Sequence, residues 1–145
     1  MRTRKSPRLH GYDYSLTGGY FITINAKDGL RLFGEIAESV MTLSAIGTIV
    51  AQCWQRIPTH HRHVTADIFV VMPNHVHGIL WLEESLTENT CSLGVVVATY
   101  KAAVTRTLRK SGVIDDGQIW QSRYHDHIIR TEESLNRNRA YIAEN

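Results

Sequence analysis

Cysteine is scarce in this chain, which has only two among its 145 residues, Cys53 and Cys91. The pair lacks the spacing of a metal site, and no set of further cysteines accompanies it. We therefore interpret both as buried thiols of a protein that works in a reducing compartment.

Long apolar runs are also missing. No stretch approaches the roughly 18 consecutive apolar residues that a membrane-spanning helix needs. The N-terminus is basic, but no apolar segment follows it, so no signal peptide is visible. We expect a cytoplasmic protein with no membrane partner.

The composition is typical of one globular domain, which we expect to span residues 1–145. Hydrophobic residues make up 43% of the chain and charged residues 21%, which is enough for a core. The net charge is only +2, but basic residues cluster in an N-terminal arm, 1–17, and in a later helix. Such stripes suit a bound polyanion, although solvated helix faces look the same and are commoner. The clusters are Arg2, Arg4, Lys5 and Arg8 in the arm, and Lys101, Arg106, Arg109 and Lys110 in the helix.

Hydrophobic periodicity and turn residues divide the chain into strands and helices. The patterns predict strands over 20–25, 30–36, 64–71, 75–81 and 120–130, with 26–29 as the turn of a first hairpin. Steps of three and four predict helices from 42 to just before Pro58 and over 93–108, and Thr131 as the cap of a last helix. This order indicates an α+β, ferredoxin-like (RRM-like) fold: an antiparallel sheet with two helices on one face, an extra N-terminal hairpin arm and a C-terminal helix.

Two histidines open the strand that follows the turn at 73–74. His75 and His77 are two residues apart, so on a strand they point to one face roughly 7 Å apart and can reach one point in space. The pair is therefore a candidate metal site, although alone it is more often a pair of ordinary strand histidines. We expect no metal at His60, His61 and His63, because a polar loop fixes no coordination geometry.

The last helix has a thin apolar stripe, but its polar residues are ordered. Asn138, Tyr141 and Asn145 recur at steps of three and four and share one face. Such a face can present a nucleophile and an oxygen ligand to one metal. The alternative is a tyrosine that packs with its ring buried and its hydroxyl in water.

Several motifs together resemble the REP-associated tyrosine transposases, a group of single-tyrosine HUH transposases. The resemblance covers nearly the whole chain and rests on residues 8–20, 32–36, 72–80, 120–121, 124–130, 132–135 and 140–142. It implies that His75 and His77 are the HUH pair and that Tyr141 is the nucleophile. Asn145, one helical turn further on, takes the place of the third, amide-type metal ligand.

The resemblance also implies an activity. It is a metal-dependent endonuclease and strand transferase that cuts single-stranded DNA through a 5′-phosphotyrosine intermediate, in transposition or repeat mobilisation of REP-like hairpins. The implied metal is Mg²⁺ or Mn²⁺, although ligand softness alone ranks Zn²⁺ or Cu²⁺ higher for two imidazoles. The residues expected to contact DNA are Arg4, Lys5, Arg8, Lys101, Arg123 and Arg130.

Other interpretations remain open. Tyr124 is a competing nucleophile beside a second histidine pair, His125 and His127, but it lacks the helical partner that Tyr141 has, so we interpret these three as structural or DNA-facing. A non-catalytic nucleic-acid-binding module on the same fold would stack bases on Phe69 and Trp81. Metal-dependent cleavage would separate the two classes, and the sequence leaves open whether the protein is a monomer or a homodimer.

Overall fold

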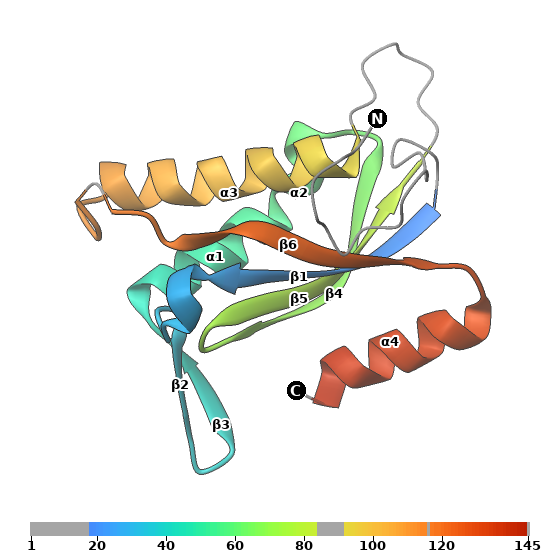
Figure 1. The fold of residues 1–145 in the computed structure, drawn as a ribbon, viewed down its shortest axis with the longest axis horizontal. Coiled ribbons are helices and arrows are strands. Elements are labelled where there is room, and N and C mark those ends of the chain that lie inside the picture. Colours follow the sequence, from blue (N-terminus) through green and yellow to red (C-terminus); the bar gives the residue numbers. More distant parts are fainter. Residues whose placement is uncertain (1–17, 84–91, 116, 145) are drawn as a thin grey trace.

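A central four-stranded antiparallel sheet organises the protein. The computed structural model describes residues 18–83, 92–115 and 117–144. The sheet has the order β4-β5-β1-β6, and its strands are β1 (Gly18–Ala26), β4 (Val64–Met72), β5 (His75–Leu82) and β6 (Trp120–Ile129). Helices α1 (Ala45–Gln55) and α3 (Leu93–Lys110) connect the strands and cover one face, together with the short α2 (Ile57–His60). Figure 1 shows α4 (Glu132–Glu144) lying across the opposite face.

The strand β1 divides the interior into two layers, because successive side chains of a strand point to opposite faces. Tyr20, Ile22 and Ile24 are fully buried and face α1 and α3 in the main core. Trp54 of α1 belongs to the same core and stacks on Phe69 of β4, with ring centroids 5.8 Å apart. The opposite face, which we call the α4 face, carries a smaller apolar cluster of Ile79, Ile129 and Ile142, with Phe21, Ile68, Val70, Trp81 and Leu135 packed against it.

This architecture confirms the predicted α+β, ferredoxin-like fold. The hairpin over 64–82, the helix over 93–108, the strand over 120–130 and the last helix are present where periodicity placed them. Thr131 caps α4 as expected, since its Oγ1 accepts a hydrogen bond of 3.0 Å from the Ser134 N–H. In the described part of the chain, no helix is long and apolar enough to cross a membrane.

The first hairpin differs from its prediction. Strand β1 does not pair with the segment after the turn at 26–29, because β5 and β6 already occupy both of its edges. A 3-10 turn, η1 (Lys27–Gly29), leads the chain away. The extra hairpin is instead formed by β2 (Gly34–Ala37) and β3 (Val40–Leu43), whose turn residues Glu38 and Ser39 have φ of 53° and 66°. This turn lacks the Asn-Gly or Asp-Gly signal that reveals such hairpins in a sequence.

The boundaries of the first helix also differ. Thr42 and Leu43 belong to β3, and α1 begins after Ser44, whose Oγ accepts a hydrogen bond of 3.0 Å from the Gly47 N–H. Pro58 lies inside the short α2, in the first turn, where a missing N–H costs nothing. The N-terminal arm 1–17, the linker 85–89 and Cys91 lie outside the described residues, whereas Cys53 is a buried free thiol, as predicted.

Gly78 provides a test of core packing. A Cβ at this position would lie 2.2 Å from Cζ2 of the fully buried Trp54, so Gly78→Ala should lower the free energy of unfolding by about 1–3 kcal/mol through overpacking. Urea denaturation measures this. Gly117→Ala is the matched control, because its Cβ would meet nothing within 4 Å. Equal stability of the two variants would contradict the packing described here.

Candidate active site

His75 and His77 lie side by side on the α4 face of β5, an interior strand of the sheet. Their partners across the pairing with β1 are Asn25 and Thr23. The Nδ1 atom of His75 lies 2.7 Å from Asn74 Oδ1, and Nδ1 of His77 lies 2.9 Å from Thr23 Oγ1. These contacts orient both rings so that their Nε2 atoms approach each other at 3.0 Å. The convergence expected from the two-residue spacing is therefore present.

The hydrogen bonds also determine which nitrogens can bind a ligand. Asn74 Oδ1 only accepts, so His75 carries its proton on Nδ1 and has a lone pair on Nε2. The hydroxyl of Thr23 can donate or accept, and it therefore suits either tautomer of His77. With the His77 proton on Nε2, that nitrogen donates to His75. With the proton on Nδ1, Thr23 accepts it, and both Nε2 lone pairs face one point.

Burial keeps both rings neutral near pH 7. His77 is only 7% exposed, and desolvation, followed by the neighbouring charge of His75, lowers the pKa of His77 to about 4. Burial also lowers the pKa of His75. Neutral imidazoles held by second hydrogen bonds are the form in which histidine binds metal ions.

The pair fits a divalent cation. In octahedral coordination, two neighbouring ligand atoms lie about 2.1 Å from the ion and at a right angle to each other, so they are about 3 Å apart. The two Nε2 atoms are 3.0 Å apart, which matches this distance. Within the described ranges no group of three or more His, Cys, Asp or Glu gathers around one point. The predicted third ligand, Asn145, lies outside the described residues.

Helix α4 brings Tyr141 to the histidine pair. The Tyr141 ring meets the His77 ring edge-on, with centroids 5.4 Å apart, and the Phe21 ring at 6.1 Å. Tyr141 as a residue is 53% exposed, so the alternative of a buried structural ring is wrong. An exposed phenol beside two neutral imidazoles is open to a substrate that approaches from solvent.

The competing tyrosine points the other way. Tyr124 pairs with Ile24 across β6 and β1, and its ring is buried in the main core beneath α1 and α3. His125 and His127 alternate with it and lie on the α4 face, where the His127 ring is 5.2 Å from that of Phe21. Tyr124 is thus placed as a structural residue, away from the histidine pair.

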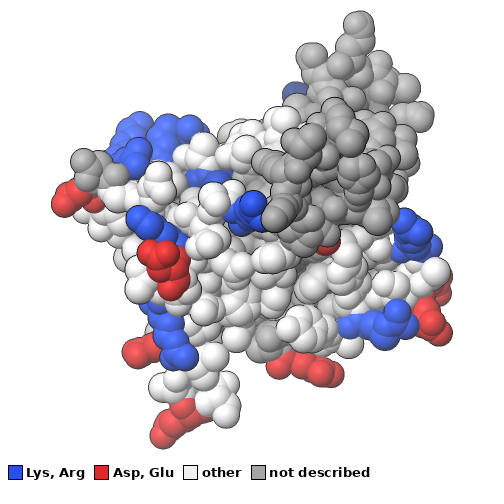
Figure 2. Space-filling model, in the orientation of Figure 1, with Lys and Arg blue, Asp and Glu red and all other residues white. Residues whose placement is uncertain are grey.

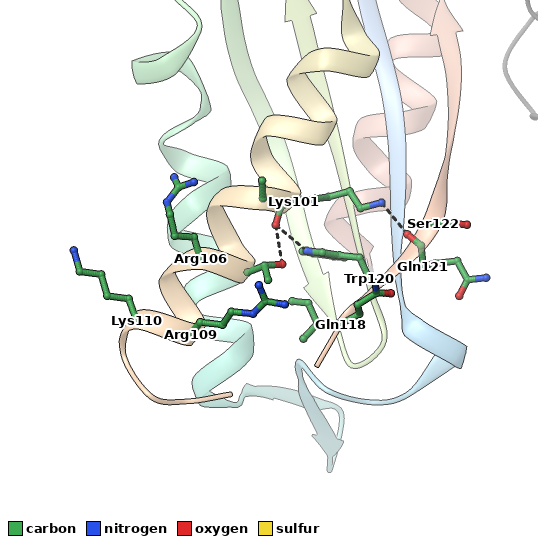
Figure 3. A pocket seen from close by; sticks show the side chains of 11 residues that line it. Lys101, Arg106, Arg109, Lys110, Gln118, Trp120, Gln121 and Ser122 are labelled. Atoms are coloured by element: carbon green, nitrogen blue, oxygen red, sulfur yellow. Dashed lines mark hydrogen bonds between the residues drawn. The ribbon is translucent and has the colours of Figure 1, made fainter. Parts of the chain in front are cut away.

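Two grooves carry Lys101 and Arg123, two of the described residues that were predicted to contact DNA. A polar hollow of about 530 Å³ includes Arg123, Asn74 and His125, and so lies next to His75. A second groove of about 790 Å³ runs between α3 and β6, where the Lys101 Nζ donates a hydrogen bond of 2.8 Å to the Gln121 carbonyl (Figure 3). Its other basic residues are Arg106, Arg109 and Lys110.

The charge distribution agrees with these grooves. Figure 2 shows basic side chains gathered over the C-terminal end of α3, whereas elsewhere on this side acidic and basic side chains lie near one another. Arg130 is exposed just before α4. The predicted contacts Arg4, Lys5 and Arg8 lie outside the described residues.

Sequence reasoning missed the residues that hold the histidines. Thr23 is 54 positions from His77, and only strand pairing brings the two together. The expectation that bases would stack on Phe69 and Trp81 together was also wrong. Phe69 lies in the main core, whereas Trp81 lies on the α4 face, so the two rings do not share a surface. No periodicity in a single sequence reports which strands become neighbours.

Comparison with known proteins places this geometry in context. No family model matches the chain. Solved structures that share its fold include a REP-associated tyrosine transposase bound to a REP hairpin, at 16% identity and a TM-score of 0.62, and a candidate transposase from Deinococcus radiodurans, at 17% identity and a TM-score of 0.57. The first similarity covers 96% of this chain and 70% of the other, and the second covers 94% and 95%.

A protein of Haemophilus influenzae is similar in sequence. It is described as uncharacterised, and it is 39% identical over an alignment 160 positions long, which covers 98% of this chain and 87% of the relative. Identity at this level over nearly the full length of both chains shows common descent. The chain therefore belongs to the same family as this Haemophilus influenzae protein.

Proposed function

We propose that this protein is a metal-dependent endonuclease and strand transferase for single-stranded DNA, with Tyr141 as its nucleophile. The observation that carries the proposal is the convergence of His75 and His77 at 3.0 Å beside the exposed Tyr141 ring. The fold shared with a transposase bound to a REP hairpin supports hairpin DNA as the substrate. The reaction would serve transposition or the mobilisation of repeats.

The proposed reaction exchanges one phosphoester bond for another. The Tyr141 hydroxyl oxygen attacks the scissile phosphorus, the bond from phosphorus to the 3′ oxygen breaks, and the phenolic proton is lost as the leaving oxygen gains one. The products are a 5′-phosphotyrosine and a free 3′-hydroxyl. Because the covalent link conserves the bond energy, a 3′-hydroxyl can reverse the step and rejoin strands without ATP.

The chain's own residues prepare this step. An unperturbed phenol has a pKa of about 10 and is a weak nucleophile near pH 7. A bound Mg²⁺ or Mn²⁺ would polarise the phosphate and neutralise its developing charge. His75 and His77 would hold that ion, with Asn145, four residues after Tyr141 in the sequence, proposed as an oxygen ligand. Thr23 and Asn74 orient the two rings.

The grooves suggest how DNA would lie. We propose that the unpaired strand crosses the α4 face beside Arg123, and that phosphates of the paired stem lie along the groove of Lys101, Arg106, Arg109 and Lys110. Arg130 and the basic residues of the arm, Arg4, Lys5 and Arg8, would add further phosphate contacts. Basic side chains hold phosphates without reading sequence, so sequence would be read in the unpaired part.

Loss of the tyrosine hydroxyl tests the reaction. Labelled hairpin oligonucleotides with single-stranded flanks, incubated with Mn²⁺ and run on a denaturing gel, should give a covalent adduct with the wild-type protein. Tyr141→Phe and His75→Ala should abolish it. Tyr124→Phe is the matched control and should retain the adduct, because its ring faces the main core.

Two results would overturn the assignment: an adduct in Tyr141→Phe, or loss of the adduct in a folded Tyr124→Phe protein. No adduct with the wild type, but metal-independent retention of the hairpin, would favour the non-catalytic binding module.

Thr23→Val tests the support of the metal site. The substitution keeps the shape of the side chain but removes the hydroxyl that would accept the His77 Nδ1 proton, so Mn²⁺ affinity should fall about 10–100-fold. Isothermal titration calorimetry measures this directly. Thr65→Val removes a comparable hydroxyl that bonds to Glu83 instead, and it should bind Mn²⁺ like the wild type. Equal affinities in all three proteins would show that Thr23 does not support metal binding, and no Mn²⁺ binding by the wild type would argue against a histidine metal site.

The salt dependence of hairpin binding tests whether the groove of Lys101 and Arg106 holds phosphates of the paired stem. Arg106→Gln should reduce the slope of log K against log salt concentration for hairpin binding by about 0.9, the value of one phosphate contact on a duplex. Arg137→Gln on α4 is the control, because Arg137 is exposed and ion-paired to Glu133 within its own helix. The slopes are obtained from fluorescence anisotropy at salt concentrations from roughly 50 to 300 mM. A groove that does not bind DNA would leave both slopes unchanged.

A further inference from the structure

Helix α4 has little apolar surface with which to bind the sheet. Of its 13 described residues, Ile142 alone is buried, and Leu135 packs only partly against the α4 face. Burial of one such side chain is worth about 1.5–3 kcal/mol, and isolated helices of this length are marginal in water. The Tyr141 ring adds contacts with His77 and Phe21, but its residue is half exposed, so a further contact with the sheet would help to determine where the helix lies.

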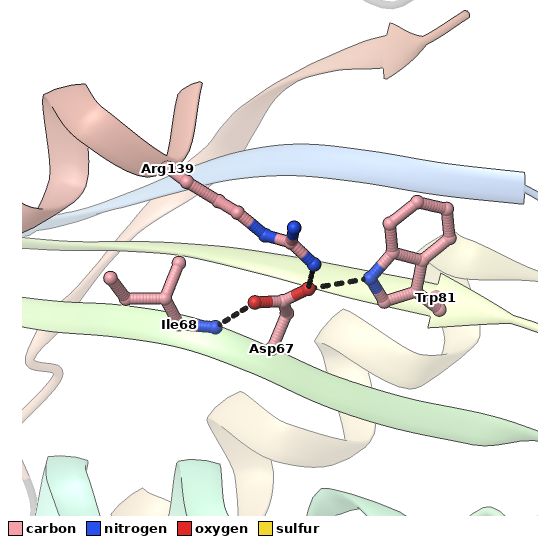
Figure 4. A network of polar contacts seen from close by, with 4 residues as sticks. All are labelled: Asp67, Ile68, Trp81 and Arg139. Carbon is pink, nitrogen blue, oxygen red and sulfur yellow. Dashed lines mark hydrogen bonds and ion pairs between the residues drawn. The ribbon is translucent and has the colours of Figure 1, made fainter. Parts of the chain in front are cut away.

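Arg139 supplies that contact. Leu135, Arg139 and Ile142 are separated by four and three positions, so they form one stripe of the helix, and this stripe faces the sheet. The Arg139 Nη2 lies 2.7 Å from Asp67 Oδ2 of β4, and the same oxygen accepts a hydrogen bond of 2.8 Å from Trp81 Nε1 (Figure 4). The Asp67 side chain is 17% exposed and that of Arg139 is 44% exposed.

A β-bulge directs the carboxylate toward the helix. Ala66 pairs with Leu80 and Phe69 pairs with Gly78, so Asp67 and Ile68 together face the single residue Ile79. The extra residue places both Asp67 and Ile68 on the α4 face, where Ile68 joins the apolar cluster. In a regular strand, only one residue between Ala66 and Phe69 would reach that face.

The acceptor is held rigidly and kept charged. A Cβ on Gly19 would lie 2.7 Å from the Trp81 ring, so this glycine makes room for the indole that donates to Asp67. Burial by itself would raise the pKa of Asp67, but hydrogen bonds from Arg139, Trp81 and the Ile68 N–H outweigh it and hold that pKa below its usual value. The carboxylate is therefore ionised near pH 7.

We propose that Asp67, Trp81 and Arg139 form a clasp that fixes α4 on the sheet and so positions Tyr141 against the histidine pair. The catalytic part of this proposal rests on the proposed role of Tyr141 as nucleophile. Arg139 precedes Tyr141 by two residues and leans toward β4, whereas the Tyr141 ring meets His77 of β5. The clasp thus restrains rotation of α4 about its apolar contacts, and the members are positioning residues that do not touch the reacting atoms.

Hydrogen exchange tests the docking without reference to activity. Arg139→Gln and Asp67→Asn should each speed exchange of the α4 amides about 5- to 30-fold in the protein of residues 1–145, and the double variant should add little to either single one. Arg137→Gln is the matched control, because it breaks an exposed ion pair on the same helix that reaches no other element. Unchanged exchange in the clasp variants, or equal changes in the control, would overturn the clasp.

Kinetics test the positioning. In adduct formation with the hairpin substrate in the presence of Mn²⁺, the clasp variants should lower kcat tenfold or more with KM nearly unchanged, since displacement of a reacting group by about 1 Å can cost about a hundredfold in rate. Faster exchange with unchanged kcat would overturn the positioning role while leaving the docking in place. Absence of any adduct in the wild type would instead refute the proposed function, and the positioning role with it, and exchange would still decide the docking.

Discussion

The pairing of β1 with β5 on one edge and with β6 on the other is the constraint on which the rest of the structure depends. This pairing occupies both edges of β1. The side chains of β1 alternate, so one set faces the main core under α1 and α3 and the other set faces the α4 face. Thr23 reaches His77 only because this register holds. The same nine residues therefore stabilise the fold and orient the candidate metal ligands.

The sequence was informative where the decisive interactions are local. Steps of three and four located α3, the turn at 73–74 located the hairpin, and the spacing of His75 and His77 predicted their convergence. The first hairpin was misplaced because the turn residues at 26–29 do not reveal that β5 and β6 occupy both edges of β1. The contact of Thr23 with His77 spans 54 positions and that of Asp67 with Arg139 spans 72, and no local pattern contains such contacts. The placement of Tyr141 beside the histidines followed from family resemblance and not from periodicity.

The site combines rigid and weakly held parts. The histidines lie on an interior strand, and their second nitrogens are fixed by neighbouring side chains, so as candidate ligands they would need little reorganisation to bind a cation. The tyrosine lies on a helix with one buried side chain and an ion pair that is half open to water. Elements with few buried contacts open at low free energy, so the sheet and α4 differ in how readily they leave their places.

The bulge in β4 has an evolutionary consequence. Loss of the single codon for Asp67 would let Ala66, Ile68 and Phe69 face Leu80, Ile79 and Gly78 one to one, so the sheet would become more regular rather than less. The main core and the histidine pair would persist, but Arg139 would have no acceptor. A lineage could thus uncouple the proposed nucleophile, Tyr141, from the sheet in one mutational event that purifying selection on folding would not oppose.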